Sequence, residues 1–196
     1  MQQSRIILAS ASPRRKELMT QAGFEFDIQV SHKEEKYVST QPEEIVKELS
    51  LLKAEDIASQ NEDANLIVIG ADTIVAIDER ILGKPKDKED ALDMVHAMQG
   101  RSHQVYTGVA IIRFDSEGKK EVISHAVCTD VVVYPMSEEE MLAYVEDDSI
   151  MDKAGAYAIQ GEFGAKYIER FEGDYYNVVG LPISYIYQVL KKSATQ

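Results

Sequence analysis

The sequence contains a single cysteine among 196 residues, so the chain cannot form an internal disulfide, and one thiol fits a reducing compartment. Its four histidines (His32, His96, His103 and His125) are scattered and, together with Cys128, show no zinc-type spacing. No stretch approaches the roughly 20 apolar residues that a membrane-spanning helix needs. The first residues also lack a secretory signal pattern, in which an apolar run follows basic residues. We therefore expect a cytoplasmic protein without a membrane partner.

Basic residues are outnumbered, with 21 Lys and Arg against 34 Asp and Glu and a formal net charge of -13. Such a chain does not favour nucleic acid as a partner, because a nucleic-acid backbone requires an extended basic face. Residues 1–16 are the exception, since they contain Arg5, Arg14, Arg15 and Lys16 and no acidic residue. A concentrated basic site on an acidic chain suits a small phosphorylated ligand better than nucleic acid.

Internal repeats, linkers and low-complexity segments are also absent from the sequence. The hydrophobic fraction of 44%, with 8% aromatic residues, is ordinary for a globular protein that buries a core. At this length we expect one domain over residues 1–196, or one domain with two lobes. If the protein uses a metal, carboxylates should hold it, which favours magnesium or manganese.

The most informative stretch lies near the N-terminus. Residues 6–9 form an apolar run that predicts a buried strand, and Ser12 with Pro13 predicts the start of a helix. A strand that leads into a helix N-terminus directs free backbone N–H groups and the positive end of a dipole at one point. Arg14 and Arg15 fall in that first turn, the unfavourable end of a helix for a cation, and a bound polyanion would account for them. Solvated surface arginines are the alternative, and this stretch alone does not choose between the two.

Alternating apolar residues predict a second strand over residues 24–30, followed by a polar segment over residues 31–36. Ligand groups in α/β sheets gather where strands end and loops begin, so Glu34 and Glu35 are candidates for a functional site. Adjacent glutamates in a loop are more often simply solvated.

A buried charge is expected on each of the next two elements. The first is a helix over residues 42–58, in which Lys53 falls inside the apolar stripe and either snorkels to solvent or reaches an internal anion. The second is a strand over residues 66–77, the most apolar stretch of the chain, with Gly70 as a point where it could break. Asp72 is the only charge in that strand. An unpaired buried carboxylate is very costly, so Asp72 must meet a cation, a metal or several donors.

The second half of the chain adds two candidates. Lys84 follows a hairpin in a loop that could lie close to Asp72. Gln160 ends a segment rich in small residues, 151–161, and offers a donor and an acceptor to an amide-like edge, although a plain structural loop is an equal alternative. The remaining elements are predicted as helices over residues 87–98, 137–145 and 181–192, and strands over 81–82, 104–114, 121–134 and 166–170.

In sequence order, these motifs resemble the Maf family of nucleotide pyrophosphatases, which share the fold of inosine triphosphate pyrophosphatase. The resemblance covers nearly the whole chain and predicts a single Maf-like domain over residues 1–196. The motifs that carry it are Ser10 to Leu18, Glu34-Glu35, Lys53-Ala54, Gly70-Ala71-Asp72-Thr73, Lys84-Pro85, Gly100-Arg101-Ser102-His103, Asp152 to Tyr157, Ile159-Gln160-Gly161 and Val179-Gly180-Leu181-Pro182.

The resemblance implies a fold and a reaction. The fold is α/β, an elongated mixed twisted sheet with flanking helices and two lobes around a cleft. The reaction is hydrolysis of a nucleoside triphosphate to the monophosphate and pyrophosphate, as a house-cleaning activity. The Ile159-Gln160-Gly161 form resembles the subgroup that acts on dTTP and UTP, with modified pyrimidine nucleotides as further substrates. Ala158, where relatives often have glycine, makes the segment slightly stiffer.

The resemblance also assigns roles to individual residues. A divalent cation, Mg²⁺ or Mn²⁺, is implied as cofactor. Arg14 and Arg15 are implied to bind the phosphates, with Lys53 and Lys84 completing the cationic ring. Asp72 and Glu35 are implied to bind the metal or activate the water. Ser10 and Ser12 are implied to offer hydroxyl and backbone donors, and Gln160 to recognise the base.

A different class of function stays open. The chain could be a regulator of septum formation or cell division that binds a nucleotide, or a partner protein, without turnover. Asp72 beside cationic groups favours catalysis, because a pure binder gains little from that carboxylate. A homodimer is a working guess that no motif supports.

Overall fold

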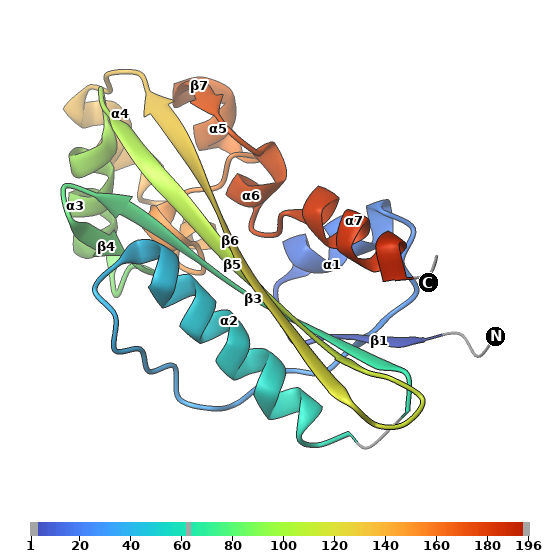
Figure 1. The fold of residues 1–196 in the computed structure, drawn as a ribbon. Helices are drawn as coiled ribbons and strands as arrows, with labels where there is room; N and C mark the ends of the chain where they lie inside the picture. The colour runs from blue at the N-terminus through green and yellow to red at the C-terminus, as the bar shows by residue number, and fades with distance from the viewer. Residues whose placement is uncertain (1–3, 62–63, 194–196) are drawn as a thin grey trace. The chain divides into compact units, whose positions relative to one another are not determined.

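The computed structural model describes residues 4–61 and 64–193, and the chain divides into two compact units. Unit 1 comprises Met1–Asp72, Thr107–Val127 and Gly180–Gln196, and unit 2 comprises Thr73–Tyr106 and Cys128–Val179. Three strands contribute residues to both units: β3 (Leu66–Ile77), β5 (Ser102–Phe114) and β6 (Lys120–Val133) (Figure 1). The single domain over residues 1–196, the elongation and the cleft stay predictions.

Seven strands within the described ranges form one mixed sheet with the order β2-β1-β3-β5-β6-β7, and β4 (Arg80–Leu82) pairs with β3. Strand β1 (Arg5–Leu8) runs parallel to β2 (Asp27–Ile28) and to β3. Strand β4 is antiparallel to β3, and β7 (Ile168–Glu172) is antiparallel to β6. The predicted α/β class with a mixed sheet and flanking helices is confirmed.

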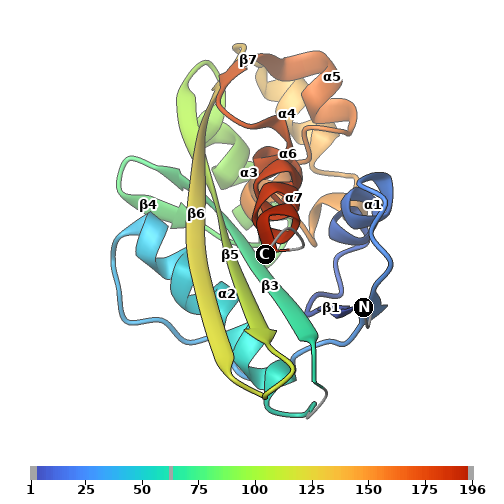
Figure 2. The same ribbon diagram turned by 45° about the vertical axis from the view of Figure 1, so that its right-hand side comes forward.

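Unit 1 contains the helices α1 (Pro13–Gln21), α2 (Pro42–Ala58) and α7 (Ile183–Ser193). Helix α2 comes very close to the sheet because two strand positions are glycine. A Cβ at Gly108 would lie 2.1 Å from the carbonyl oxygen of Val46, and one at Gly70 would lie 2.2 Å from that of Ser50. Helix α7 covers the opposite face, where Arg113 donates to the carbonyl of Val189 (Figure 2).

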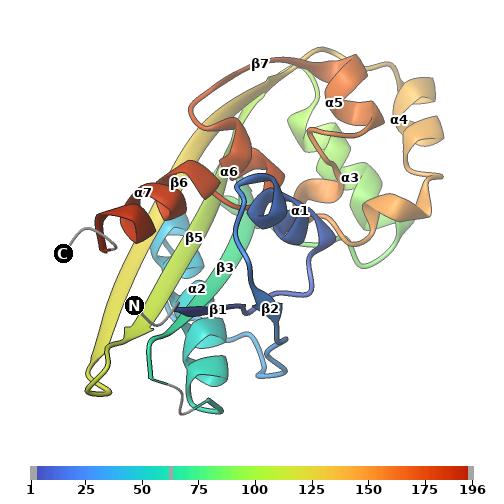
Figure 3. The same cartoon turned by 90° about the vertical axis from the view of Figure 1, so that its right-hand side faces the viewer.

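Unit 2 contains the helices α3 (Lys88–Met98), α4 (Glu138–Tyr144), α5 (Glu162–Tyr167) and α6 (Tyr175–Val179), with short 3₁₀ turns at Asp148–Ile150 and Ala154–Ala156. Helices α3, α4 and α5 gather on one side of the unit (Figure 3). Helix α4 begins with a capping box, because the Ser137 hydroxyl accepts from the Glu140 N–H and the Glu140 carboxylate accepts from the Ser137 N–H. The core of this unit is apolar and aromatic, with Phe163 among its fully buried side chains.

Four elements differ from their sequence predictions. Strand β2 is only two residues long instead of spanning 24–30, and β3 runs through Gly70 without a break. Helix α5 ends at Tyr167, so the strand predicted over 166–170 begins only at Ile168, and α6 was not predicted. In the part of the chain that the structure describes, no helix has both the length and the apolar composition for crossing a membrane.

Candidate functional site

The loop between β1 and α1 presents the N-terminus of a helix of nine residues. Ser12 occupies the predicted N-cap position and Pro13 the first helical position, but the Ser12 side chain does not cap the first turn. The hydroxyl of Ser10 is largely buried and accepts from the Ser12 N–H at 3.2 Å. This loop is therefore folded back on Ser10, and no acidic side chain of the first turn neutralises the helix dipole.

Arg15 is anchored more firmly than a surface arginine. Its Nη1 donates to the carbonyl of Ala71 at 2.8 Å and to the Ser10 hydroxyl at 3.1 Å, and its Nε donates to the carbonyl of Gly180 at 2.7 Å. Burial lowers the pKa of the Arg15 guanidinium, the charge of Asp72 opposes that shift, and neighbouring Arg14 adds to it. Arginine stays protonated in proteins, so Arg15 places a fixed positive charge beside the middle of β3.

Lys53 and Asp72, each predicted as a charge on a buried face, form an ion pair with each other. The Lys53 Nζ lies 2.5 Å from the Asp72 Oδ1, and the side chains are only 15% and 11% exposed. The same Nζ lies 3.0 Å from the Glu35 Oε1, whose side chain is 55% exposed. One ammonium from α2 thus joins a carboxylate at the centre of β3 to a carboxylate in the segment after β2.

The segment that carries Glu35 has little regular structure and is tied to α2 at two points. Asp56 accepts from the Ser31 hydroxyl at 2.7 Å and pairs with Lys33 at 3.6 Å. The Ser31 hydrogen bond, followed by the charge of Lys33, lowers the pKa of the Asp56 carboxyl. Glu48 accepts from the backbone N–H of Val38 at 2.8 Å. These tethers hold the segment from which Glu35 reaches Lys53.

The donor set is suited to a hard divalent cation. Asp72 and Glu35 offer carboxylate oxygens. One oxygen of each lies close to the same Lys53 Nζ, at 2.5 Å for Asp72 and 3.0 Å for Glu35, so the two carboxylates are near each other. Mg²⁺ is commonly held by one or two carboxylates together with substrate phosphates and water. No group of three His, Cys, Asp or Glu side chains fit to hold a metal occurs among residues 4–61 and 64–193, so these two would rely on such additional ligands. An ion held there competes with the Lys53 ammonium for the same oxygens.

The two remaining candidates, Lys84 and Gln160, belong to unit 2, and both are exposed. The segment that ends at Gln160 is hydrogen-bonded to the loop that carries Lys84. The N–H of Gly155 in that segment donates to the carbonyl of Gly83, the residue before Lys84, at 2.9 Å. A Cβ at Gly155 would lie 2.9 Å from the Val75 side chain, so the segment packs closely on β3. The structure thus brings the Lys84 loop and the segment that ends at Gln160 together within one unit.

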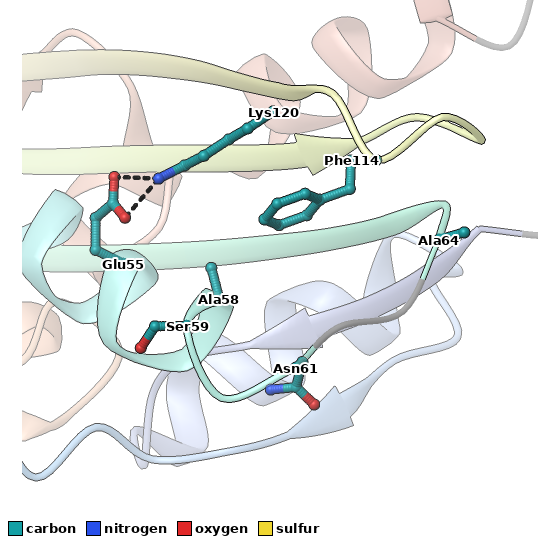
Figure 4. A pocket seen from close by; sticks show the side chains of 8 residues that line it. Glu55, Ala58, Ser59, Asn61, Ala64, Phe114 and Lys120 are labelled. Atoms are coloured by element: carbon teal, nitrogen blue, oxygen red, sulfur yellow. Dashed lines mark hydrogen bonds and ion pairs between the residues drawn. The ribbon is translucent and has the colours of Figure 1, made fainter.

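A cavity of about 400 Å³ opens elsewhere in unit 1, between the end of α2 and the β5–β6 hairpin (Figure 4). None of the predicted site residues lines it. Its two charged residues neutralise each other, because the Lys120 Nζ lies 2.6 Å from a carboxylate oxygen of Glu55. The cavity therefore offers no net positive charge for a phosphate group. Its lining residues are Glu55, Ala58, Ser59, Asn61, Ala64, Phe114, Gly118 and Lys120.

Comparison with known proteins decides the family. A family model described as Maf-like protein matches residues 5–193. This chain belongs to the Maf family. It is 49% identical over 187 residues to the dTTP/UTP pyrophosphatase of Lachnoclostridium phytofermentans, with 95% of this chain and 94% of the relative covered. The corresponding proteins of Agathobacter rectalis and Bacillus anthracis are 46% and 47% identical and cover 96% of this chain, with 97% and 95% of their own lengths included.

Solved structures resemble this Maf-family chain only distantly. A HAM1 protein from Coxiella burnetii aligns with a TM-score of 0.45 and 17% identity, over 67% of this chain and 73% of that one. The Ham1 protein of Staphylococcus aureus aligns with a TM-score of 0.40 and 15% identity, over 66% and 72%. Likeness at this level carries no argument about the site.

Two features of the site were not found from the sequence. Arg15 bonds backbone carbonyls of β3 and of the Gly180 turn, which only the folded chain reveals. Asp56 fixes the segment around Glu35 through Ser31 and Lys33. The position of Asp56 on the inward face of α2 was the sequence signal that could have predicted this contact.

Proposed function

We propose that this chain hydrolyses dTTP and UTP to the nucleoside monophosphate and pyrophosphate. The observation that carries the proposal is the Lys53 ammonium held between the carboxylates of Asp72 and Glu35, with Arg15 bonded to the backbone of the residue before Asp72. The Maf relatives at 46–49% identity that bear the name dTTP/UTP pyrophosphatase support the same reaction.

The triphosphate tail is proposed to bind at the N-terminus of α1. Backbone N–H groups and the helix dipole favour an anion there, and Ser10 and Ser12 add hydroxyl groups. Arg14 supplies the contact with the phosphates, and Arg15 supplies a buried positive charge that its three hydrogen bonds hold in place. Lys53 and Lys84 are proposed to spread the charge that develops on the leaving pyrophosphate.

Asp72 and Glu35 are proposed to hold a divalent cation, Mg²⁺ or Mn²⁺. When bound, such an ion neutralises phosphate charge and favours a nucleophilic water. The carboxylates themselves orient the attacking water and accept its proton. The oxygen of that water forms a bond with the α-phosphorus while the bond from the α-phosphorus to the bridging oxygen breaks, so pyrophosphate leaves. Lys53 keeps the two carboxylates together before substrate arrives.

Gln160 is proposed to recognise the base. Its amide offers both a donor and an acceptor, which matches the edge of a uracil or thymine ring. A site that hydrogen-bonds its substrate strongly rejects analogues that lack those groups, because its own polar atoms are left unpaired. Modified pyrimidine nucleotides that keep this edge belong to the same proposal.

The setting of this activity is also a proposal. The single thiol supports the cytoplasm, and the net charge of -13 supports a small nucleotide rather than nucleic acid as partner. The oligomeric state is to be measured by light scattering of the purified protein, with a homodimer as the proposed state.

The deciding experiment is a panel of nucleoside triphosphates, modified ones included, with pyrophosphate release measured in magnesium and in manganese. We expect dTTP and UTP to be hydrolysed fastest, with equal amounts of monophosphate and pyrophosphate formed. Preferred hydrolysis of purine triphosphates would overturn the assignment of Gln160. Tight nucleotide binding without any pyrophosphate release would favour the regulator of cell division instead.

A further inference from the structure

Unit 2 buries a histidine and a tyrosine against each other, and the proposed chemistry uses neither. His103 on β5 is 1% exposed and Tyr157 is 6% exposed. The His103 Nε2 lies 2.7 Å from the Tyr157 hydroxyl, and the two rings meet edge to face with centroids 5.4 Å apart. The Nδ1 of His103 is buried and has no hydrogen-bond partner among the described residues. The histidine therefore makes one specific polar contact, and that contact is with the segment that leads to Gln160.

This segment is held in a conformation that its sequence does not favour. Gly155 and Ala156 both have positive φ angles, 69° and 58°, and positive φ is unusual for alanine. Such residues persist only where the surroundings hold them in place. The hydroxyl of Tyr144 donates to the Ala156 carbonyl at 2.9 Å, and the Gly155 N–H donates to the Gly83 carbonyl.

The segment is also fixed on the far side of Gln160. Helix α5 packs so closely on it that a Cβ at Gly164 would lie 1.8 Å from the carbonyl oxygen of Ile159. The ring of Phe163 contacts both Tyr157 and Tyr144, with centroids 4.9 and 5.2 Å apart. Gln160 itself is exposed. An exposed amide thus stands on a short stretch of backbone that is held on both sides.

We infer that the buried His103–Tyr157 pair is a positioning device for base recognition: it fixes residues 154–161 so that the amide of Gln160 is presented in one orientation. The inference rests on the proposed function, because it assigns Gln160 to the base. His103 and Tyr157 are positioning residues, since they act through the segment and do not touch the substrate. Burial lowers the pKa of His103 to about 4, so the ring is neutral at physiological pH and the contact is not switched by protonation there.

The test compares two tyrosine-to-phenylalanine variants within the same aromatic cluster. Tyr157→Phe removes the hydroxyl that meets His103 and keeps the ring on Phe163. Tyr167→Phe is the matched control, because Tyr167 also packs on Phe163, with centroids 5.5 Å apart, while its hydroxyl faces Glu140. We expect the amides of residues 154–161 to exchange hydrogen at least fivefold faster in Tyr157→Phe and at the wild-type rate in Tyr167→Phe.

Binding measurements then separate the base from the phosphates. For a non-hydrolysable α,β-imido analogue of UTP, we expect Tyr157→Phe to raise Kd at least fivefold. The Kd for inorganic tripolyphosphate, which has no base, should stay within twofold of wild type. In the hydrolysis assay the KM for UTP should rise with little change in kcat, and the preference for UTP over CTP should narrow.

A pair of histidine variants provides rescue. His103→Gln keeps an amide that can donate or accept near the position of Nε2 and should keep most of the UTP-analogue affinity, whereas His103→Leu should behave like Tyr157→Phe. Unchanged exchange and unchanged analogue affinity in Tyr157→Phe would overturn the inference, as would equal weakening of analogue and tripolyphosphate. A wild-type protein that binds the analogue but hydrolyses no nucleotide would overturn the proposed function, while the exchange and binding data would still decide the inference.

Discussion

Arg14 and Arg15 are neighbours in the chain, but we expect different results from removing them. Arg15→Ala takes the donors away from the carbonyls of Ala71 and Gly180, so it should lower the free energy of unfolding by about 1.5–3 kcal/mol as well as reduce activity. Arg14→Ala should cut kcat/KM at least tenfold, about 1.4 kcal/mol of lost transition-state stabilisation, with little change in Tm. Thermal unfolding beside kcat/KM for each variant checks this. Normal kinetics in Arg14→Ala would show that Arg14 is a surface charge without a role in turnover.

Asp72 combines a structural ion pair with a proposed catalytic role. In Asp72→Asn the Lys53 ammonium keeps Glu35 as a partner, so the loss of stability should stay below the 3–5 kcal/mol typical of a fully unpaired buried charge. Turnover should fall by orders of magnitude, because the proposed metal ligand and proton acceptor is removed. We would measure Tm in chelator and turnover in magnesium. A variant that melts far lower yet turns over normally in the cold would leave Asp72 with a structural role alone.

His103 should make stability depend on pH in the acidic range. Burial lowers its pKa from 6.5 to about 4, although the nearby charge of Asp130 opposes the shift. Between these values the unfolded chain binds a proton and the folded chain does not, so stability is complete above pH 6.5 and is lost as pH falls towards 4. The loss attributable to this group is about 3 kcal/mol. Urea unfolding at a series of pH values should show this loss of stability in the wild type but not in His103→Gln. Identical dependence of stability on pH in the two proteins would contradict the prediction.

At the scale of elements, the packing of α2 against β5 depends on one missing side chain. A Cβ at Gly108 would lie 2.1 Å from a backbone oxygen of α2, so Gly108→Ala should destabilise the protein by about 1–3 kcal/mol or more. Gly83→Ala is the control, because nothing lies within 4 Å of its Cβ position, and its effect should stay within about 0.5 kcal/mol. Chemical denaturation of both variants decides this. Equal stability of the two variants would show that α2 can move away from β5 without a loss of stability.

Elements with strong hydrophobic patterns were predictable from the sequence. Helix α2 and strand β3 begin and end at the predicted residues, 42–58 and 66–77, since each buries a face or both faces in the core. Strand β2 was overestimated because its length is limited by pairing with only two residues of β1, which periodicity cannot reveal. Helix α6 is five residues long and was missed, although Asp174 accepts from the Tyr176 N–H and was a usable start signal.

The candidate site was predictable in its charges and less so in its connections. A lysine on an apolar helix face and a lone aspartate in an apolar strand each required a partner, and the structure pairs Lys53 with Asp72. The backbone carbonyls that accept from Arg15 lie 56 and 165 residues away in the chain, and no local pattern encodes such a contact. The metal, base and phosphate roles stay predictions.

For the whole molecule, we expect a metal requirement for turnover but not for folding. The carboxylates of Asp72 and Glu35 already have the Lys53 ammonium as counter-charge, so the folded state has no repulsion that a metal must relieve. Chelator should therefore abolish pyrophosphate release and leave Tm unchanged. Adding Mg²⁺ or Mn²⁺ should restore release. A large fall of Tm in chelator would instead assign the metal a structural role.

The bond from Arg15 to Gly180 also has a consequence for the order of synthesis. The acceptor is made 165 residues after the donor, so at a usual rate of about 5–20 residues per second it follows roughly 10–30 s later. During that interval a nascent chain carries the whole of unit 2 while its early arginine still lacks one of its acceptors. Anion binding at the start of α1 should consequently be acquired late, after most of the polypeptide has left the ribosome.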